Sequence, residues 1–174
     1  GCSLRLPAVI GKEEEHRYNW KDRIKRNREY VRRLLNLSER ERQEELQRLN
    51  SEYERMGREG FHEQQREQFE TRQWGLSDDE IFFMRRKAIL WSWIDDRDSA
   101  RAIERALVEE YRGSHAFYIA SKHNVVNYPI KELAKLYLPQ IKDLRPTKEG
   151  ENSLVSIQKA RELIGFEPKY NREN

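Results

Sequence analysis

Three aspartates close together, Asp95, Asp96 and Asp98, are the residues of this sequence whose types and spacing most suggest chemistry. Carboxylates at such short spacing are able to hold a hard metal ion or to act as an acid and base pair. A metal ion needs further ligands, and the sequence has neither a second oxygen-rich cluster nor histidines at ligand spacing. Capping of a helix start is the simpler interpretation, so we predict no metal site.

The residues on either side predict the elements that position these aspartates. A short run rich in aromatic residues, which begins near Ile89 and includes Trp91 and Trp93, is typical of a β-strand. After the aspartates, apolar residues recur at three- and four-residue steps, which predicts an amphipathic helix. Its inward face is expected to carry Ala100, Ile103, Leu107 and Tyr111. Asp95, Asp98 or Ser99 would cap its first turn.

Three segments of the chain resemble the extended short-chain dehydrogenase/reductase family, the NAD(P)-dependent sugar epimerases and dehydratases. Residues 93–102 match that family's aromatic-Ile-Asp-x-Arg-Asp-x-Ala-Arg-Ala motif. Residues 153–169 resemble its closing helix with a Gly-aromatic-x-Pro end, and residues 3–11 resemble its late sheet strand and the loop that follows. The resemblance covers residues 1–11 and about 89–170. It implies an α/β fold, as a partial, C-terminal and mostly helical remnant of a Rossmann-type enzyme.

The residues that bind the cofactor and perform catalysis in that family have no convincing counterparts here. No three of the eight glycines have G-x-G-x-x-G or G-x-x-G-x-x-G spacing. Tyr118 and Lys122 imitate the family's Tyr-x-x-x-Lys pair, but they belong to a segment that resembles a strand, where residues four apart lie ~13 Å from each other. We therefore assign no catalytic residue. NAD or NADP is the cofactor of the parent family, and we expect neither to bind this chain alone.

The resemblance implies a nucleotide-sugar-like substrate. The residues expected to contact it are Arg5, Pro7, Trp91, Trp93 and Arg97. In the alternative interpretation, the two tryptophans pack under the helix and Arg97 lies on the surface. The expected partner is a missing N-terminal Rossmann half or another subunit, because a strand as apolar as Ser3 to Ile10 needs covering on both faces.

Residues 12–88 have no counterpart in the family, and their pattern predicts a charged α-helical insertion. Ile24, Val31 and Leu35 mark one apolar stripe, and a second contains Leu46, Leu49, Tyr53 and Met56. Capping boxes are predicted at Ser38–Glu41 and Ser77–Glu80. A basic first helix and a glutamate-rich second helix favour an antiparallel hairpin over residues 17–73.

This hairpin supports an alternative function, a non-enzymatic protein-interaction module. A third interpretation is RNA binding, since Tyr18, Trp20 and Tyr30 lie among arginines. The neighbouring glutamates would weaken the positive electrostatic field of these arginines, so nucleic acid is not the expected partner.

Composition sets the remaining limits on this chain of 174 residues. A net charge of +3, from 34 basic and 31 acidic residues, gives no general reason to expect nucleic acid. The lone Cys2 excludes an internal disulfide, and no apolar run reaches membrane-spanning length, so a cytoplasmic protein without a membrane partner is expected. The predicted organisation is a late sheet strand and loop (1–11), the helical insertion (12–88) and a substrate-binding α/β part (89–174).

Overall fold

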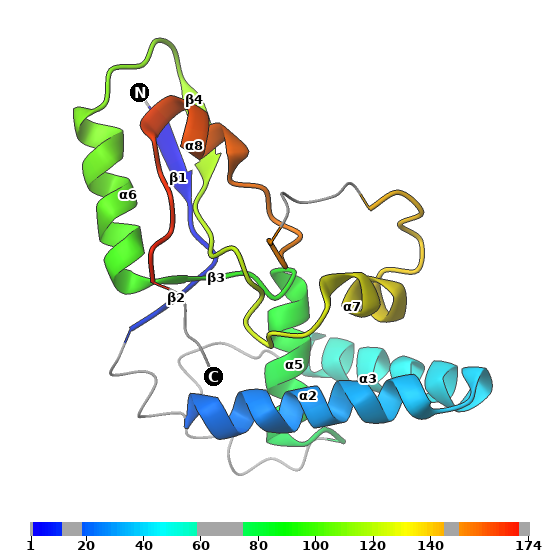
Figure 1. The fold of residues 1–174 in the computed structure, drawn as a ribbon. Helices are drawn as coiled ribbons and strands as arrows, with labels where there is room; N and C mark the ends of the chain where they lie inside the picture. The colour runs from blue at the N-terminus through cyan, green and yellow to red at the C-terminus, as the bar shows by residue number, and fades with distance from the viewer. Residues whose placement is uncertain (1, 12–18, 59–74, 145–149, 171–174) are drawn as a thin grey trace.

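The computed structural model describes residues 2–11, 19–58, 75–144 and 150–170. The chain has a mixed α/β fold in which helices predominate and the strands form two small parallel sheets (Figure 1). The strands are β1 (Cys2–Arg5), β2 (Ala8–Ile10), β3 (Trp93–Asp95) and β4 (His115–Tyr118). The helices are α2 (Trp20–Asn36), α3 (Glu39–Arg58), α5 (Asp78–Ala88), α6 (Asp96–Val108), α7 (Ile130–Tyr137) and α8 (Gln158–Ile164).

The first segment of the chain lies beside both later strands. β1 pairs in parallel with β4, with Leu4 opposite Phe117, and β2 pairs in parallel with β3, with Val9 opposite Ile94. The single strand expected from Ser3 to Ile10 is divided at Leu6 and Pro7, because proline has no N–H to donate to a ladder. The β3 and β4 segments belong to different sheets, but Ser121 N donates to Trp93 O at 2.7 Å, just beyond the end of β4.

The strand expected to begin near Ile89 starts four residues later. α5 continues through the basic residues to Ala88, and Leu90 and Trp91 then adopt left-handed backbone angles, with φ of 55° and 52°. Such angles are uncommon for residues other than glycine and are incompatible with a strand. The aromatic run is therefore a tight turn that leads into β3.

Two hydrophobic cores meet at β3. The first contains the buried faces of α2, α3, α5 and α7, together with Trp91 and Trp93. The second lies between α6, β4 and α8 and includes Ile94 and Phe117. Because successive side chains of a strand point to opposite faces, Trp93 belongs to the first core and Ile94 to the second. The first core therefore contains residues from both sides of the boundary predicted at residue 88, because α7 packs with α2, α3 and α5.

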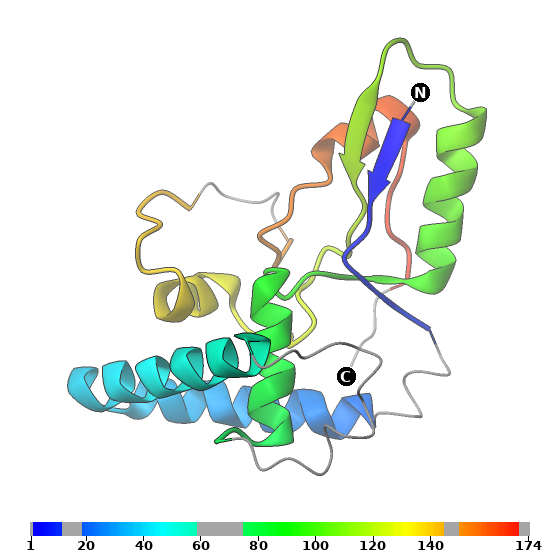
Figure 2. The ribbon, with the colours of Figure 1, turned by 180° about the vertical axis from the view of Figure 1, so that it is seen from behind.

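The helical hairpin is present in the described part of the insertion, where α2 and α3 lie side by side and are joined at Leu37 and Ser38 (Figures 1 and 2). Both predicted capping boxes are confirmed. Ser38 N donates to Glu41 Oε2 at 3.0 Å, and Glu41 N donates to Ser38 Oγ at 3.4 Å. Ser77 and Glu80 make the same reciprocal bonds at the start of α5. Residues 17, 18 and 59–73 of the predicted hairpin lie outside the described residues.

The inward face expected for α6 is wrong. The structure buries Asp98, Ser99, Ala102 and Ala106, whereas Ile103 is 47% exposed and Leu107 is 80% exposed. α6 carries two apolar stripes, and the one with small side chains packs against α8 and the strands. Of the expected face, only Tyr111 packs against the second core, and it does so partly buried. Within the described residues, no helix is both long and apolar enough to cross a membrane.

Candidate functional site

β2 and β3 run in the same direction, so their carboxyl ends meet at one edge. Gly11 follows β2 and lies against Asp96, the first residue of α6; a Cβ on Gly11 would be 2.7 Å from Asp96 Oδ2. A larger residue at position 11 would require the exposed Asp96 side chain to move. Ligands of open parallel sheets bind outside the carboxyl ends of the strands, which makes this place the candidate site. We call Gly11, Asp95, Asp96, Arg97 and Tyr170 the strand-end site.

The predicted helix cap is confirmed at Asp95, which is 1% exposed and accepts a hydrogen bond from Arg97 N at 3.0 Å. Arg97 also binds Asp95 through its side chain, with Nε 2.8 Å from Oδ1 and Nη2 2.9 Å from Oδ2. Burial opposes ionisation of Asp95, but the hydrogen bonds from Arg97 outweigh it and keep the pKa of Asp95 below its ordinary value. The same hydrogen bond raises the pKa of Arg97.

Arg97 is held from two sides and still reaches solvent. Its guanidinium carbon lies 3.7 Å from the centre of the Tyr170 ring, and its side chain is 46% exposed. Asp95 engages Nε and Nη2, so among the described residues the Nη1 edge is left to a ligand. A guanidinium fixed in this way offers hydrogen bonds in one defined direction, which suits a carboxylate or phosphate oxygen.

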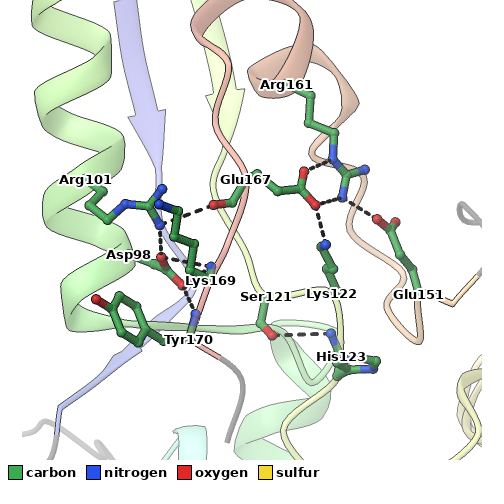
Figure 3. A network of polar contacts seen from close by, with 10 residues as sticks. All are labelled: Asp98, Arg101, Ser121, Lys122, His123, Glu151, Arg161, Glu167, Lys169 and Tyr170. Atoms are coloured by element: carbon green, nitrogen blue, oxygen red, sulfur yellow. Dashed lines mark hydrogen bonds and ion pairs between the residues drawn. The ribbon is translucent and has the colours of Figure 1, made fainter.

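Asp98 anchors the end of the described chain against α6 (Figure 3). Its carboxylate is fully buried and lies 2.6 Å from Arg101 Nη1. It also accepts backbone hydrogen bonds from Lys169 at 3.1 and 3.0 Å and from Tyr170 at 2.9 Å. We call residues 166–170 the C-terminal strap. By holding the strap, Asp98 places the Tyr170 ring over Arg97.

A second ionic network ties the strap to the segment after β4 (Figure 3). Arg161 Nε donates to Glu167 Oε2 at 2.6 Å, and Arg161 also pairs with the nearly buried Glu151. Lys122 pairs with the same Glu167. Burial opposes ionisation of Glu167, but hydrogen bonds from Arg161 and Lys122 lower its pKa below the ordinary value.

Tyr118 and Lys122 each contact another residue in this structure. Tyr118 belongs to β4, is 50% exposed and accepts a hydrogen bond from Arg5 Nη1 at 3.2 Å, while Lys122 pairs with Glu167. The two side chains therefore have separate partners.

The five residues expected to contact substrate are not gathered into one site. Arg97 lies at the strand-end site, and Trp93 precedes it in β3 but is only 4% exposed. Trp91 is fully buried, with its ring centroid 5.6 Å from those of both Phe83 and Tyr137. Arg5 is exposed on β1, and Pro7 is half-buried between β1 and β2.

Asp98, Gly11 and Tyr170 contribute to this arrangement without having been singled out as site residues. The sequence indicates Asp98 only as a helix cap or metal ligand, and Gly11 only as part of the segment 3–11. The contact between Arg97 and Tyr170 joins residues far apart in sequence, so no local spacing indicates it. Among the described residues, no group of three or more His, Cys, Asp or Glu side chains is arranged to hold a metal ion.

Comparison with known proteins adds no relative: no family model, no curated protein and no solved structure matches this chain.

Proposed function

We propose that this chain is the substrate-binding portion of an NAD(P)-dependent oxidoreductase of the sugar epimerase or dehydratase type, and that it is not catalytic alone. The observation that carries the proposal is the strand-end site. Two parallel strands end together there, and Arg97 presents a half-exposed, fixed guanidinium edge beside the first turn of a helix. This is where an α/β sheet offers a small anionic ligand its binding groups.

In the proposed role, Arg97 donates hydrogen bonds to the phosphate oxygens of a nucleotide-sugar-like substrate. Since Asp95 neutralises its charge, Arg97 contributes directed hydrogen bonds more than long-range attraction. Of the five residues expected to contact the substrate, only Arg97 lies at the strand-end site, and the proposal does not depend on Arg5, Pro7, Trp91 or Trp93. NAD or NADP would bind a separate Rossmann half or another subunit. We also place the protein in the cytoplasm, in keeping with its lone cysteine.

Two experiments test this proposal, one with the purified chain and one with Arg97 replaced. The purified chain is expected to show no hydride transfer with NAD⁺ or NADP⁺ and UDP-glucose, and measured transfer would overturn the proposal. In calorimetric titrations with UDP-glucose, Arg97→Ala should raise the Kd about 10- to 100-fold, since a hydrogen bond to a charged group contributes ~1.5–3 kcal/mol. Lys131→Ala, which removes an exposed cation of α7, should leave the Kd unchanged. Equal affinities of wild type and Arg97→Ala would contradict the assigned role.

Arg97→Ala also leaves the buried Asp95 without its guanidinium partner, so thermal unfolding must be followed in parallel. Titrations are then compared only at temperatures at which both proteins are folded. Arg97→Lys separates the two effects, because it keeps a cation beside Asp95 but loses the planar fork.

One observation favours the alternative function, a protein-interaction module. Most arginines of the hairpin pair with carboxylates, as Arg26 does with Asp79 and Arg48 with Glu45. Three exposed cations at four- and seven-residue steps along α2 form no ion pair with a described carboxylate. We call them the α2 basic stripe: Lys21, Lys25 and Arg32. Such a stripe suits an acidic partner segment.

The same helix offers little to single-stranded RNA within the described residues. Trp20 is 4% exposed, and Tyr30 packs edge-on against Phe83, so neither presents a free ring for base stacking. Tyr18, the third aromatic residue of the RNA interpretation, lies outside the described residues. An acidic protein is therefore the partner that we infer for the stripe.

Charge reversal on the stripe tests the module. If α2 docks an acidic protein, Lys21→Glu combined with Arg32→Glu should weaken binding of a fluorescent poly-glutamate peptide by at least about tenfold, since two rim contacts of about 1 kcal/mol each are replaced by repulsion. Arg40→Glu on α3, whose side chain is 89% exposed, is the matched control. No binding of the peptide by wild type would reject the module. Tighter binding of polyuridylate, falling steeply with salt, would favour RNA instead.

A further inference from the structure

The net charge of the strand-end site is the starting observation. Its charged side chains are two carboxylates, Asp95 and Asp96, and one guanidinium, Arg97, so the site carries a net charge of −1. Asp95 binds both Nε and Nη2 of Arg97 and thereby balances its charge. The neighbouring Asp98 is balanced in turn by Arg101. Within the described part of the chain, Asp96 is the carboxylate of this site that forms no ion pair.

Asp96 is exposed and lies close to the atoms that Arg97 offers to a ligand. It is the first residue of α6, and its Oδ1 accepts a hydrogen bond from Arg97 N at 2.9 Å. Hydrogen bonding to Asp95 is the main cause that raises the pKa of Arg97, and the carboxylate of Asp96 raises it further. A ligand bound to Nη1 of Arg97 therefore also lies in the electrostatic field of Asp96.

The Lys169 side chain, the nearest cation of the strap, points away from the Tyr170 ring (Figure 3). Among the described residues, the positive charge that meets a ligand at this site is thus that of Arg97, which Asp95 already balances. The charge of Asp96 then decides the sign of the field at the site.

Phosphate groups differ in the charge on which this field acts. A phosphate that is bonded on two sides, like each phosphate of a nucleotide-sugar, carries one negative charge. A terminal phosphate loses its second proton at a pH of about 6 and carries nearly two negative charges at about pH 7.5. Because electrostatic energy is proportional to the charge of the ligand, a net charge of −1 repels the terminal phosphate more strongly.

We propose that Asp96 determines the specificity of the strand-end site, which favours a phosphate bonded on both sides over a terminal phosphate. This inference rests on the proposed function, in which Arg97 binds the phosphates of a nucleotide-sugar-like substrate. Both kinds of phosphate accept hydrogen bonds from Arg97, so Arg97 alone does not discriminate between them. The charge of Asp96 does, and the site therefore holds an intact nucleotide-sugar more tightly than a free nucleoside diphosphate.

Calorimetric titrations of residues 1–174 with UDP-glucose and with UDP, at low ionic strength, test the inference. Asp96→Asn removes the charge and keeps an oxygen that accepts from Arg97 N, so the start of α6 is retained. Repulsion between two unit charges a few ångströms apart in water changes a Kd about threefold. At about pH 7.5, Asp96→Asn should lower the Kd of UDP-glucose about threefold and that of UDP about tenfold. Each ligand is compared with itself, so contacts of the glucose group cancel.

A pH profile gives a second readout, because below about pH 6 the terminal phosphate of UDP carries one charge. In wild type, the ratio of the Kd of UDP to that of UDP-glucose should rise about threefold between about pH 5.5 and 7.5. The ratio should stay constant in Asp96→Asn and rise again in Asp96→Glu, which keeps the charge. Glu104→Gln removes an exposed carboxylate ~12 Å further along α6 and should leave both dissociation constants unchanged.

The outcomes separate this inference from the proposed function. If Arg97→Ala weakens binding of UDP-glucose but Asp96→Asn changes both dissociation constants by the same factor, the inference is wrong and the function stands. Weaker binding of UDP-glucose by Asp96→Asn would show that Asp96 accepts a hydrogen bond from the ligand, and would also overturn the inference. If wild type binds neither ligand, the proposed function fails and the inference fails with it.

Discussion

Replacing Trp91 by alanine is expected to lower the free energy of unfolding by ~3–5 kcal/mol, the range for deleting a large buried aromatic ring. Trp91 is fully buried and packs against Phe83 of α5 and Tyr137 of α7, so its loss opens a cavity where three elements meet. Both tryptophan and alanine pay the same steric cost at a φ of 52°, and the comparison therefore isolates the ring. Urea unfolding followed by far-UV circular dichroism measures the change.

Trp91→Phe is the informative companion variant. Within the described residues, Nε1 of Trp91 is buried and has no hydrogen-bond partner. Phenylalanine keeps most of the ring and removes this unpaired group, so its cost should stay below about 2 kcal/mol. Equal losses for the alanine and phenylalanine variants would show that the ring is not what supports the core.

Replacing Asp98 by alanine should have an effect of similar size for an electrostatic reason. The carboxylate is fully buried and serves Arg101 and the backbone N–H groups of Lys169 and Tyr170. Removing one partner of a buried ion pair costs about 3–5 kcal/mol because the other partner is left uncompensated. At about 2–4 °C per kcal/mol for a chain of this size, the midpoint of thermal unfolding should fall by roughly 10 °C.

The strap distinguishes this prediction from general destabilisation. In Asp98→Ala, the amides of Lys169 and Tyr170 should exchange with solvent faster than those of α2, because they lose their acceptor. Asp98→Asn keeps one acceptor oxygen and should lose less. Glu104→Ala, at an exposed position of the same helix, should change stability by no more than about 0.5 kcal/mol. Unchanged exchange at Tyr170 in Asp98→Ala would contradict the anchoring role.

Local signals predicted the helices well. A serine followed three residues later by a glutamate predicts a helix start. This pattern occurs at Ser38 with Glu41 and at Ser77 with Glu80, and the structure has both capping boxes. The strand predicted to begin near Ile89 was wrong because β-propensity does not distinguish a strand from a turn. The left-handed backbone angles at Leu90 and Trp91 can be seen only in the structure. Propensity describes the conformation that a residue type prefers on average. Here the tertiary packing of Trp91 determines its backbone conformation instead.

The α6 face shows a limit of periodicity. Ile103 and Leu107 have the spacing of an inward stripe, but Ala102 and Ala106 have it too, and a pattern cannot say which stripe meets the neighbouring elements. At the candidate site, the cap at Asp95 was predictable because it is local. Asp98 and Tyr170 were not, since their contacts depend on the strap returning across the fold.

The hairpin and α7 share the first hydrophobic core, so the hairpin cannot be deleted without affecting the rest of the fold. Tyr30 of α2 packs on Phe83, and Arg28 Nε donates to the carbonyl of Val126 at 2.8 Å, ahead of α7. Excising residues 20–58 would therefore uncover the ring of Phe83 and remove the donor to the Val126 carbonyl. A shortened chain would need a new cover for Phe83 in order to stay soluble.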